Sequence, residues 1–143
     1  MSEFKLTTEG IRYIALFESL TGGMARDCVV DEENERIIFV IKKGDRGAAI
    51  GRKGSNINRV KKSVGKQIEI VEYSEDVKEF LENLFQPAAI KNVMVVNKNS
   101  KRLAYVEVAN KDKGIAIGRD GRNILKAKML AQRHHGVDDI IIQ

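Results

Sequence analysis

The stretch "AIGRKGSNI" at residues 49–57 returns as "AIGRDGRNI" at residues 116–124. The second copy lies 67 residues after the first, and the identities extend back to Asp45 and Gly47, which match Asp112 and Gly114. A period of this length is too long for a solenoid repeat and is the size of a small domain. We therefore predict two copies of one domain, at residues 1–73 and 74–143.

Both copies predict the same order of helices and strands. In the first, a helix capped by Thr7 or Thr8 precedes strands at residues 26–30 and 36–41, a short helix at 47–50, the glycine-bounded turn, a second helix, and a strand at 66–73. In the second, we expect Ser74 to cap the first helix and the last strand to lie at residues 138–143. The order α-β-β-α-α-β therefore occurs twice.

The charge distribution favours a nucleic-acid partner. The net charge is only +5 and the pI is about 9.3. Lysines and arginines nevertheless dominate residues 42–66 and 111–133, whereas residues 31–35 and 69–82 are acidic. Each basic stretch contains one copy of the repeated turn. We therefore expect two separate positive surfaces.

The remaining composition indicates a reduced, cytoplasmic protein. Cys28 is the single cysteine, so no disulfide can form within the chain, and its apolar neighbours place it in a core. No apolar run is long enough to span a membrane, and the N-terminus lacks the apolar core of a signal peptide. We expect a monomer with no membrane partner.

The repeated turn has the chemistry of a phosphate contact. A Gly-x-x-Gly turn between two helices directs backbone N–H groups and the positive end of a helix dipole toward an anion. The glycines also let a phosphodiester approach without a Cβ in the way. Arg52 and Lys53 at the tip can contact phosphate oxygens, and Ile50 and Ile57 can line an apolar groove for bases.

The pattern I-G-x-x-G-x-x-I resembles the signature of the KH domain, and the α-β-β-α-α-β order resembles its type II form. This resemblance implies an α+β fold in which each domain is a three-stranded mixed sheet covered by helices. It also implies a site for single-stranded RNA in each copy. The implied residues are Ile50, Gly51, Arg52, Lys53, Gly54 and Ile57, together with Ile117, Gly118, Arg119, Asp120, Gly121, Arg122 and Ile124.

Asp120 departs from the family pattern, since it brings a negative charge to a tip that would face phosphate. The second site therefore either binds more weakly than the first or relies on Arg119 and Arg122. Lys61, Lys62, Lys126 and Lys128 follow the two turns, where they form either an ordinary solvated face or further RNA contacts.

The whole chain, including "EYSEDVKEFLENLFQPA" at residues 72–88, resembles the archaeal NusA-type transcription factors. The resemblance implies binding of single-stranded RNA in transcription termination, antitermination or pausing, with RNA polymerase as a further partner. An alternative stays open: a structural KH protein of a ribonucleoprotein particle such as the ribosome.

We expect no enzymatic activity, cofactor or metal. His134 and His135 are adjacent on a predicted helix and point about 100° apart, and histidines are favourable at a helix C-terminus. The turn lacks the spacing of a Walker A loop or of a dinucleotide fingerprint. No nucleophile and base stand out as a pair.

Overall fold

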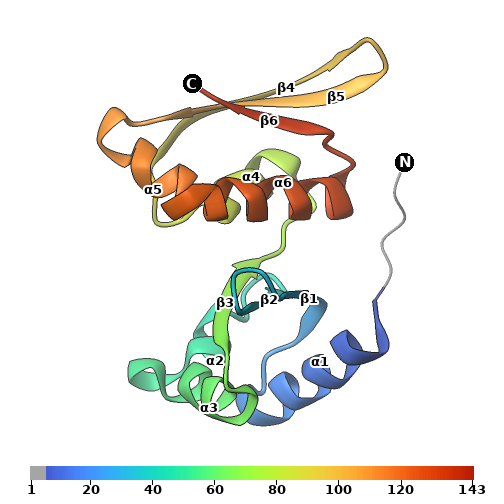
Figure 1. The fold of residues 1–143 in the computed structure, drawn as a ribbon, viewed down its shortest axis with the longest axis vertical. Helices are drawn as coiled ribbons and strands as arrows, with labels where there is room; N and C mark the ends of the chain where they lie inside the picture. Colours follow the sequence, from blue (N-terminus) through green and yellow to red (C-terminus); the bar gives the residue numbers. More distant parts are fainter. Residues whose placement is uncertain (1–5) are drawn as a thin grey trace. The chain divides into compact units, whose positions relative to one another are not determined.

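The computed structural model describes residues 6–143, and these form two compact units that meet in the chain between Ser74 and Glu75 (Figure 1). This boundary lies one residue after the predicted boundary between residues 73 and 74. Among the described residues, no helix is both long and apolar enough to cross a membrane.

The first unit follows the predicted order of elements. Its helices and strands are α1 (Thr8–Thr21), β1 (Ala25–Asp31), β2 (Arg36–Ile41), α2 (Arg46–Ile50), the 3₁₀ turn η1 (Arg52–Gly54), α3 (Ser55–Val64) and β3 (Gln67–Glu72). The Thr7 side chain caps α1 by accepting from the Gly10 N–H at 2.9 Å, and Gly22 ends the helix in the left-handed conformation.

The three strands of the first unit form a mixed sheet in the order β1-β2-β3. Strand β2 pairs antiparallel with β1 and parallel with β3 along its whole length. A core cluster of Phe17, Phe39, Val60 and their neighbours joins α1 and α3 to this sheet, and the rings of Phe17 and Phe39 stack 4.5 Å apart. Cys28 belongs to the same cluster, as predicted.

The second unit repeats the architecture with different lengths. Its elements are α4 (Val77–Phe85), β4 (Ile90–Lys98), β5 (Lys101–Val108), the turn η2 (Asn110–Asp112), α5 (Lys113–Ile117), the turn η3 (Arg119–Gly121), α6 (Arg122–His135) and β6 (Asp139–Ile142). Strand β5 pairs antiparallel with β4 and parallel with β6, and α4 packs against α6. The predicted α+β fold with two mixed three-stranded sheets is confirmed.

One predicted helix cap is wrong. Ser74 does not cap α4; the helix begins at Val77, and the Asp76 side chain accepts from the Lys78 N–H at 3.2 Å. Ser74 is instead buried at the end of the first unit, with 3% of its surface exposed. Both residues are good N-caps, so tertiary burial of the serine decided between them.

Candidate nucleic-acid interface

The first Gly-x-x-Gly turn connects α2 to α3 through a backbone that depends on glycine. Gly51 ends α2 at φ 75° and ψ 175°, a region that only glycine readily occupies. Lys53 and Gly54 then follow in the left-handed region, at φ 55° and 76°. The turn therefore places a lysine in a conformation that side chains seldom adopt.

Gly51 also has no room for a side chain. A Cβ on Gly51 would lie 2.7 Å from the side-chain Cγ of Asn56 and 2.8 Å from its backbone nitrogen. Asn56 reaches back across the turn, and its Nδ2 donates to the Ala48 carbonyl oxygen at 2.7 Å. This hydrogen bond fastens the start of α3 to α2 and fixes the shape of the turn.

The second turn, between α5 and α6, has the same backbone. Gly118 lies at φ 78° and ψ 167°, Asp120 at φ 56° and Gly121 at φ 75°. A Cβ on Gly118 would lie 2.8 Å from the Cγ of Asn123, whose Nδ2 donates to the Ile115 carbonyl oxygen at 2.7 Å.

Asn56 and Asn123 are thus positioning residues that the sequence analysis did not single out. Their identity at matching places in the two copies was the signal that could have found them. A short polar side chain that bonds to nearby backbone is the usual way to shape such a turn.

Two backbone N–H groups of each turn are hydrogen-bonded within the turn itself. The Gly54 N–H donates to the Gly51 carbonyl oxygen at 3.2 Å, and the Ser55 N–H donates to that of Arg52. In the second turn, the N–H groups of Gly121 and Arg122 are engaged in the same way. These four N–H groups therefore stabilise the turns, and the exposed side chains at the tips are available to a ligand.

The tips differ in charge. Arg52 and Lys53 are both exposed at the first tip, and Arg119 and Asp120 are both exposed at the second. Each tip stands at the N-terminus of the helix that follows, where the helix dipole is positive. The two cations of the first tip therefore add to a positive potential, whereas the Asp120 carboxylate counters it.

The four isoleucines that flank the turns do not lie in equivalent environments. Ile57 is half-buried and packs against the core of the first unit, and Ile50 and Ile124 are also half-buried. Ile117 is 43% exposed. Ile57 thus serves mainly the core, and Ile117 presents the larger apolar surface beside its turn.

The lysines that follow the turns also separate into two kinds. Lys61 and Lys62 are exposed on α3. Lys126 is buried at 8% exposure, and the Lys128 Nζ lies 3.2 Å from the Asp139 carboxylate. Lys126 is therefore removed from the solvated face, whereas Lys61, Lys62 and Lys128 remain exposed.

The two histidines at the end of α6 pack against an aromatic ring. The His134 and His135 rings lie 5.7 Å and 5.2 Å from that of the buried Phe80. Across residues 6–143, no group of three or more His, Cys, Asp or Glu side chains is arranged to hold a metal ion.

Family models identify the class of protein. Residues 11–83 match the model described as the KH domain, and residues 77–141 match that described as the NusA-like second KH domain. The molecule is thus a tandem KH-domain protein. KH domains are single-stranded RNA-binding modules whose GXXG loop clamps the nucleic-acid backbone.

Comparison with individual proteins identifies the family more closely. The chain is 42% identical over 136 residues to the "Probable transcription termination protein NusA" of Halobacterium salinarum, covering 95% of this chain and 96% of the relative. It is 41% identical to the protein of the same name from Methanococcus vannielii, covering 95% and 78%. The crystal structure of APE1850 matches with a TM-score of 0.87 at 40% identity, covering 96% of this chain and all of that one.

The chain belongs to the archaeal NusA-like family. This membership confirms the resemblance proposed from the repeated turn and favours it over the ribosomal alternative.

Proposed function

We propose that this protein binds single-stranded RNA through both Gly-x-x-Gly turns and acts in transcription termination, the process in the names of its relatives. The observation that carries the proposal is the geometry of the turns, which present exposed charged tips on one glycine-dependent backbone. The proposed contacts are Ile50, Gly51, Arg52, Lys53, Gly54, Ile57, Ile117, Gly118, Arg119, Asp120, Gly121, Arg122 and Ile124.

Electrostatics at the first tip supports an anionic ligand. Cations are unfavourable at a helix N-terminus, yet Arg52 and Lys53 both precede α3. A phosphate group beside them would neutralise the side chains and interact favourably with the helix dipole. The first tip is therefore expected to dominate the affinity for the RNA backbone.

Charge reversal at the first tip tests the proposal. We expect Arg52→Asp combined with Lys53→Asp to weaken RNA binding and to lower the slope of log affinity against log salt by roughly 1.4, or about 0.7 per lost contact. Exposed loop changes alter stability by only about 0.5 kcal/mol, so the unit should stay folded. A matched control reverses Lys78 and Lys91, two exposed lysines outside the turns. Equal slopes for the tip variant and the wild type would contradict the proposal.

RNA polymerase is the proposed protein partner, and the protein is proposed to act as a cytoplasmic monomer without catalysis. Affinity purification from cells tests the partner, since co-purification of RNA polymerase supports a transcription role. Recovery of the small ribosomal subunit instead would support the ribonucleoprotein alternative.

A further inference from the structure

The β4–β5 hairpin extends beyond the sheet to which it belongs. Strand β6 pairs only with Leu103–Val106, whereas the β4–β5 pairing continues through Asn97 with Arg102 to Lys98 with Lys101. The end of the hairpin is thus a two-stranded ribbon that projects past β6 (Figure 1). The first unit has no such projection, because β3 accompanies β2 from Arg36 to Ile41.

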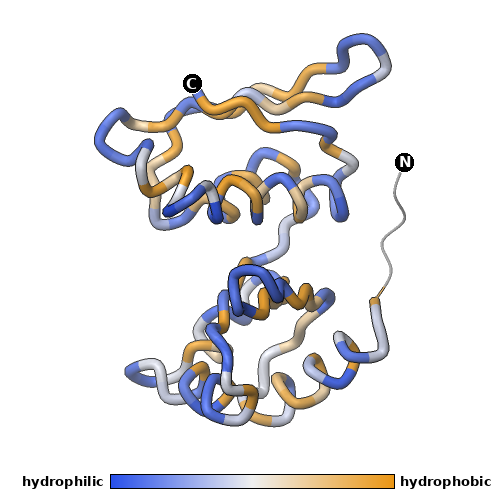
Figure 2. The backbone as a smooth tube through the Cα atoms, in the orientation of Figure 1, coloured by the Kyte–Doolittle hydropathy of each residue, from blue (hydrophilic) through white to orange (hydrophobic). Residues whose placement is uncertain are grey.

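The ribbon end concentrates positive charge. Lys98 and Lys101 are exposed and directly opposite each other. Like charges at such a cross-strand pair destabilise a hairpin. The matching pair in the first unit is complementary instead: Asp31 faces Arg36, and the Arg36 Nε donates to the Asp31 carboxylate at 2.7 Å. The ribbon end is also strongly hydrophilic (Figure 2).

The base of the ribbon is fastened to the rest of the second unit. The Arg102 N–H donates to the Asp138 carboxylate at 2.8 Å, and the Asp138 N–H donates to the Arg102 carbonyl oxygen at 2.7 Å. The Arg102 guanidinium also donates to the His135 carbonyl oxygen at 2.6 Å, at the end of α6. At the other end, Asn99 and Ser100 close a two-residue turn at φ 52° and 65°, the geometry that favours tight hairpins.

We propose that the end of this ribbon, Lys98 to Lys101, is a binding site for the phosphate backbone of RNA, separate from the Gly-x-x-Gly turns. The lysine pair is unfavourable without an anion, and the fastened ribbon holds it in place before a ligand arrives. The ribbon end and α5 lie at opposite ends of β5, which spans about 23 Å from Lys101 to Val108. The inference rests on the proposed RNA-binding function and extends the track that an RNA strand follows on the second unit.

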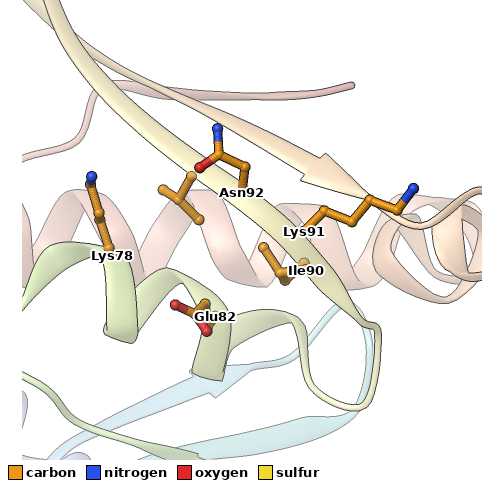
Figure 3. A pocket seen from close by; sticks show the side chains of 6 residues that line it. Lys78, Glu82, Ile90, Lys91 and Asn92 are labelled. Carbon is orange, nitrogen blue, oxygen red and sulfur yellow. The ribbon is translucent and has the colours of Figure 1, made fainter.

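The test compares two double variants of equal charge change. The first is Lys98→Glu with Lys101→Glu. The second, Lys78→Glu with Lys91→Glu, alters exposed lysines of the same unit beside a shallow pocket of about 180 Å³ between α4 and β4 (Figure 3). Each is titrated with an RNA of about four nucleotides, the length that one KH loop clamps, and with an RNA several times longer.

We expect the ribbon variant to bind the short RNA as the wild type does, and to lower the salt slope for the long RNA by roughly 1.4. The control pair should leave that slope unchanged. An equal loss of affinity for the long RNA in both double variants would overturn the proposal. The ribbon lysines would then act only through the overall positive charge of the protein. Unchanged binding of the long RNA would overturn it as well. The two proposals can fail independently. If the turns do not bind RNA, the variant with Arg52→Asp and Lys53→Asp will bind RNA as the wild type does, whatever the ribbon variant shows.

Discussion

The two Gly-x-x-Gly turns share one backbone but differ at the tip. Lys53 and Asp120 occupy the same place at φ 55° and 56°. Aspartate tolerates the left-handed conformation and stabilises a helix N-terminus, whereas lysine is disfavoured on both counts. The shape of the turn therefore does not depend on the tip residue, and the first tip holds a residue that opposes local stability.

This contrast separates the residues that shape the turn, which we call the scaffold, from the residue that would contact a ligand. The glycines and Asn56 or Asn123 set the shape of each turn, and the tip residue sets its charge. Substitutions of the glycines or asparagines should lower stability by similar amounts in both units. Substitutions of the tip residues should change stability and RNA affinity in opposite directions in the two units.

The largest effect is expected at the first glycine of each turn. Gly51→Ala and Gly118→Ala should each destabilise their unit by about 1–3 kcal/mol and remove RNA binding at that turn, because the added Cβ meets the next helix in a glycine-only conformation. Urea denaturation and RNA titration measure the two effects. Gly47→Ala and Gly114→Ala are the controls, since a Cβ there has no neighbour within 4 Å. Equal stability of test and control variants would show that the turns tolerate a side chain.

The next largest effect is expected at the two asparagines that form hydrogen bonds across the turns. Asn56→Ala and Asn123→Ala each remove a 2.7 Å hydrogen bond across the turn, so each should lower the free energy of unfolding by about 1 kcal/mol. Asn58→Ala, an exposed neighbour on α3, is the matched control and should be neutral. If only one of the two substitutions lowers the free energy of unfolding, the two turns are not stabilised in the same way.

Exchanging the tip residues should move stability and binding in opposite directions. Lys53→Asp should stabilise the first unit by about 0.3–1 kcal/mol while lowering the salt slope of RNA binding by about 0.7. Asp120→Lys should do the reverse in the second unit. Thermal unfolding and RNA titration at several salt concentrations provide the measurements. A variant that gains both stability and affinity would refute the separation of scaffold from contact.

The smallest effect is expected at the acidic hairpin of the first unit. Burial alone would raise the pKa of Asp31, but hydrogen bonds from Asn34 and Arg36 lower this pKa below its ordinary value of 3.8. A lowered carboxyl pKa contributes stability above the unfolded-state pKa, and this contribution is lost as the pH falls through the folded-state pKa. Asp31→Asn should therefore flatten the acid limb of the stability curve, measured by urea denaturation between about pH 2 and 6. An unchanged acid limb would show that the ion pair is not responsible.

The repeat, the order of elements and the place of both turns could be predicted from sequence, because the glycine spacing and the apolar periodicity are local signals. Other features depend on tertiary contacts. Ser74 is buried, and Asp76 caps α4 in its place. Lys126 is buried, although the sequence predicts it either on a solvated face or in contact with RNA. The projecting ribbon depends on where β6 begins, at Asp139 beside Leu103, and no local sequence pattern indicates this.

The most direct test of the account is an NMR titration of the whole chain with a short single-stranded RNA, following the backbone amides of both turns. We predict that the amides of Gly51 and Gly54 shift at lower RNA concentrations than those of Gly118 and Gly121, and that Asp120→Lys narrows the difference. The account would be contradicted if the RNA shifted amides elsewhere while all four glycines stayed unchanged.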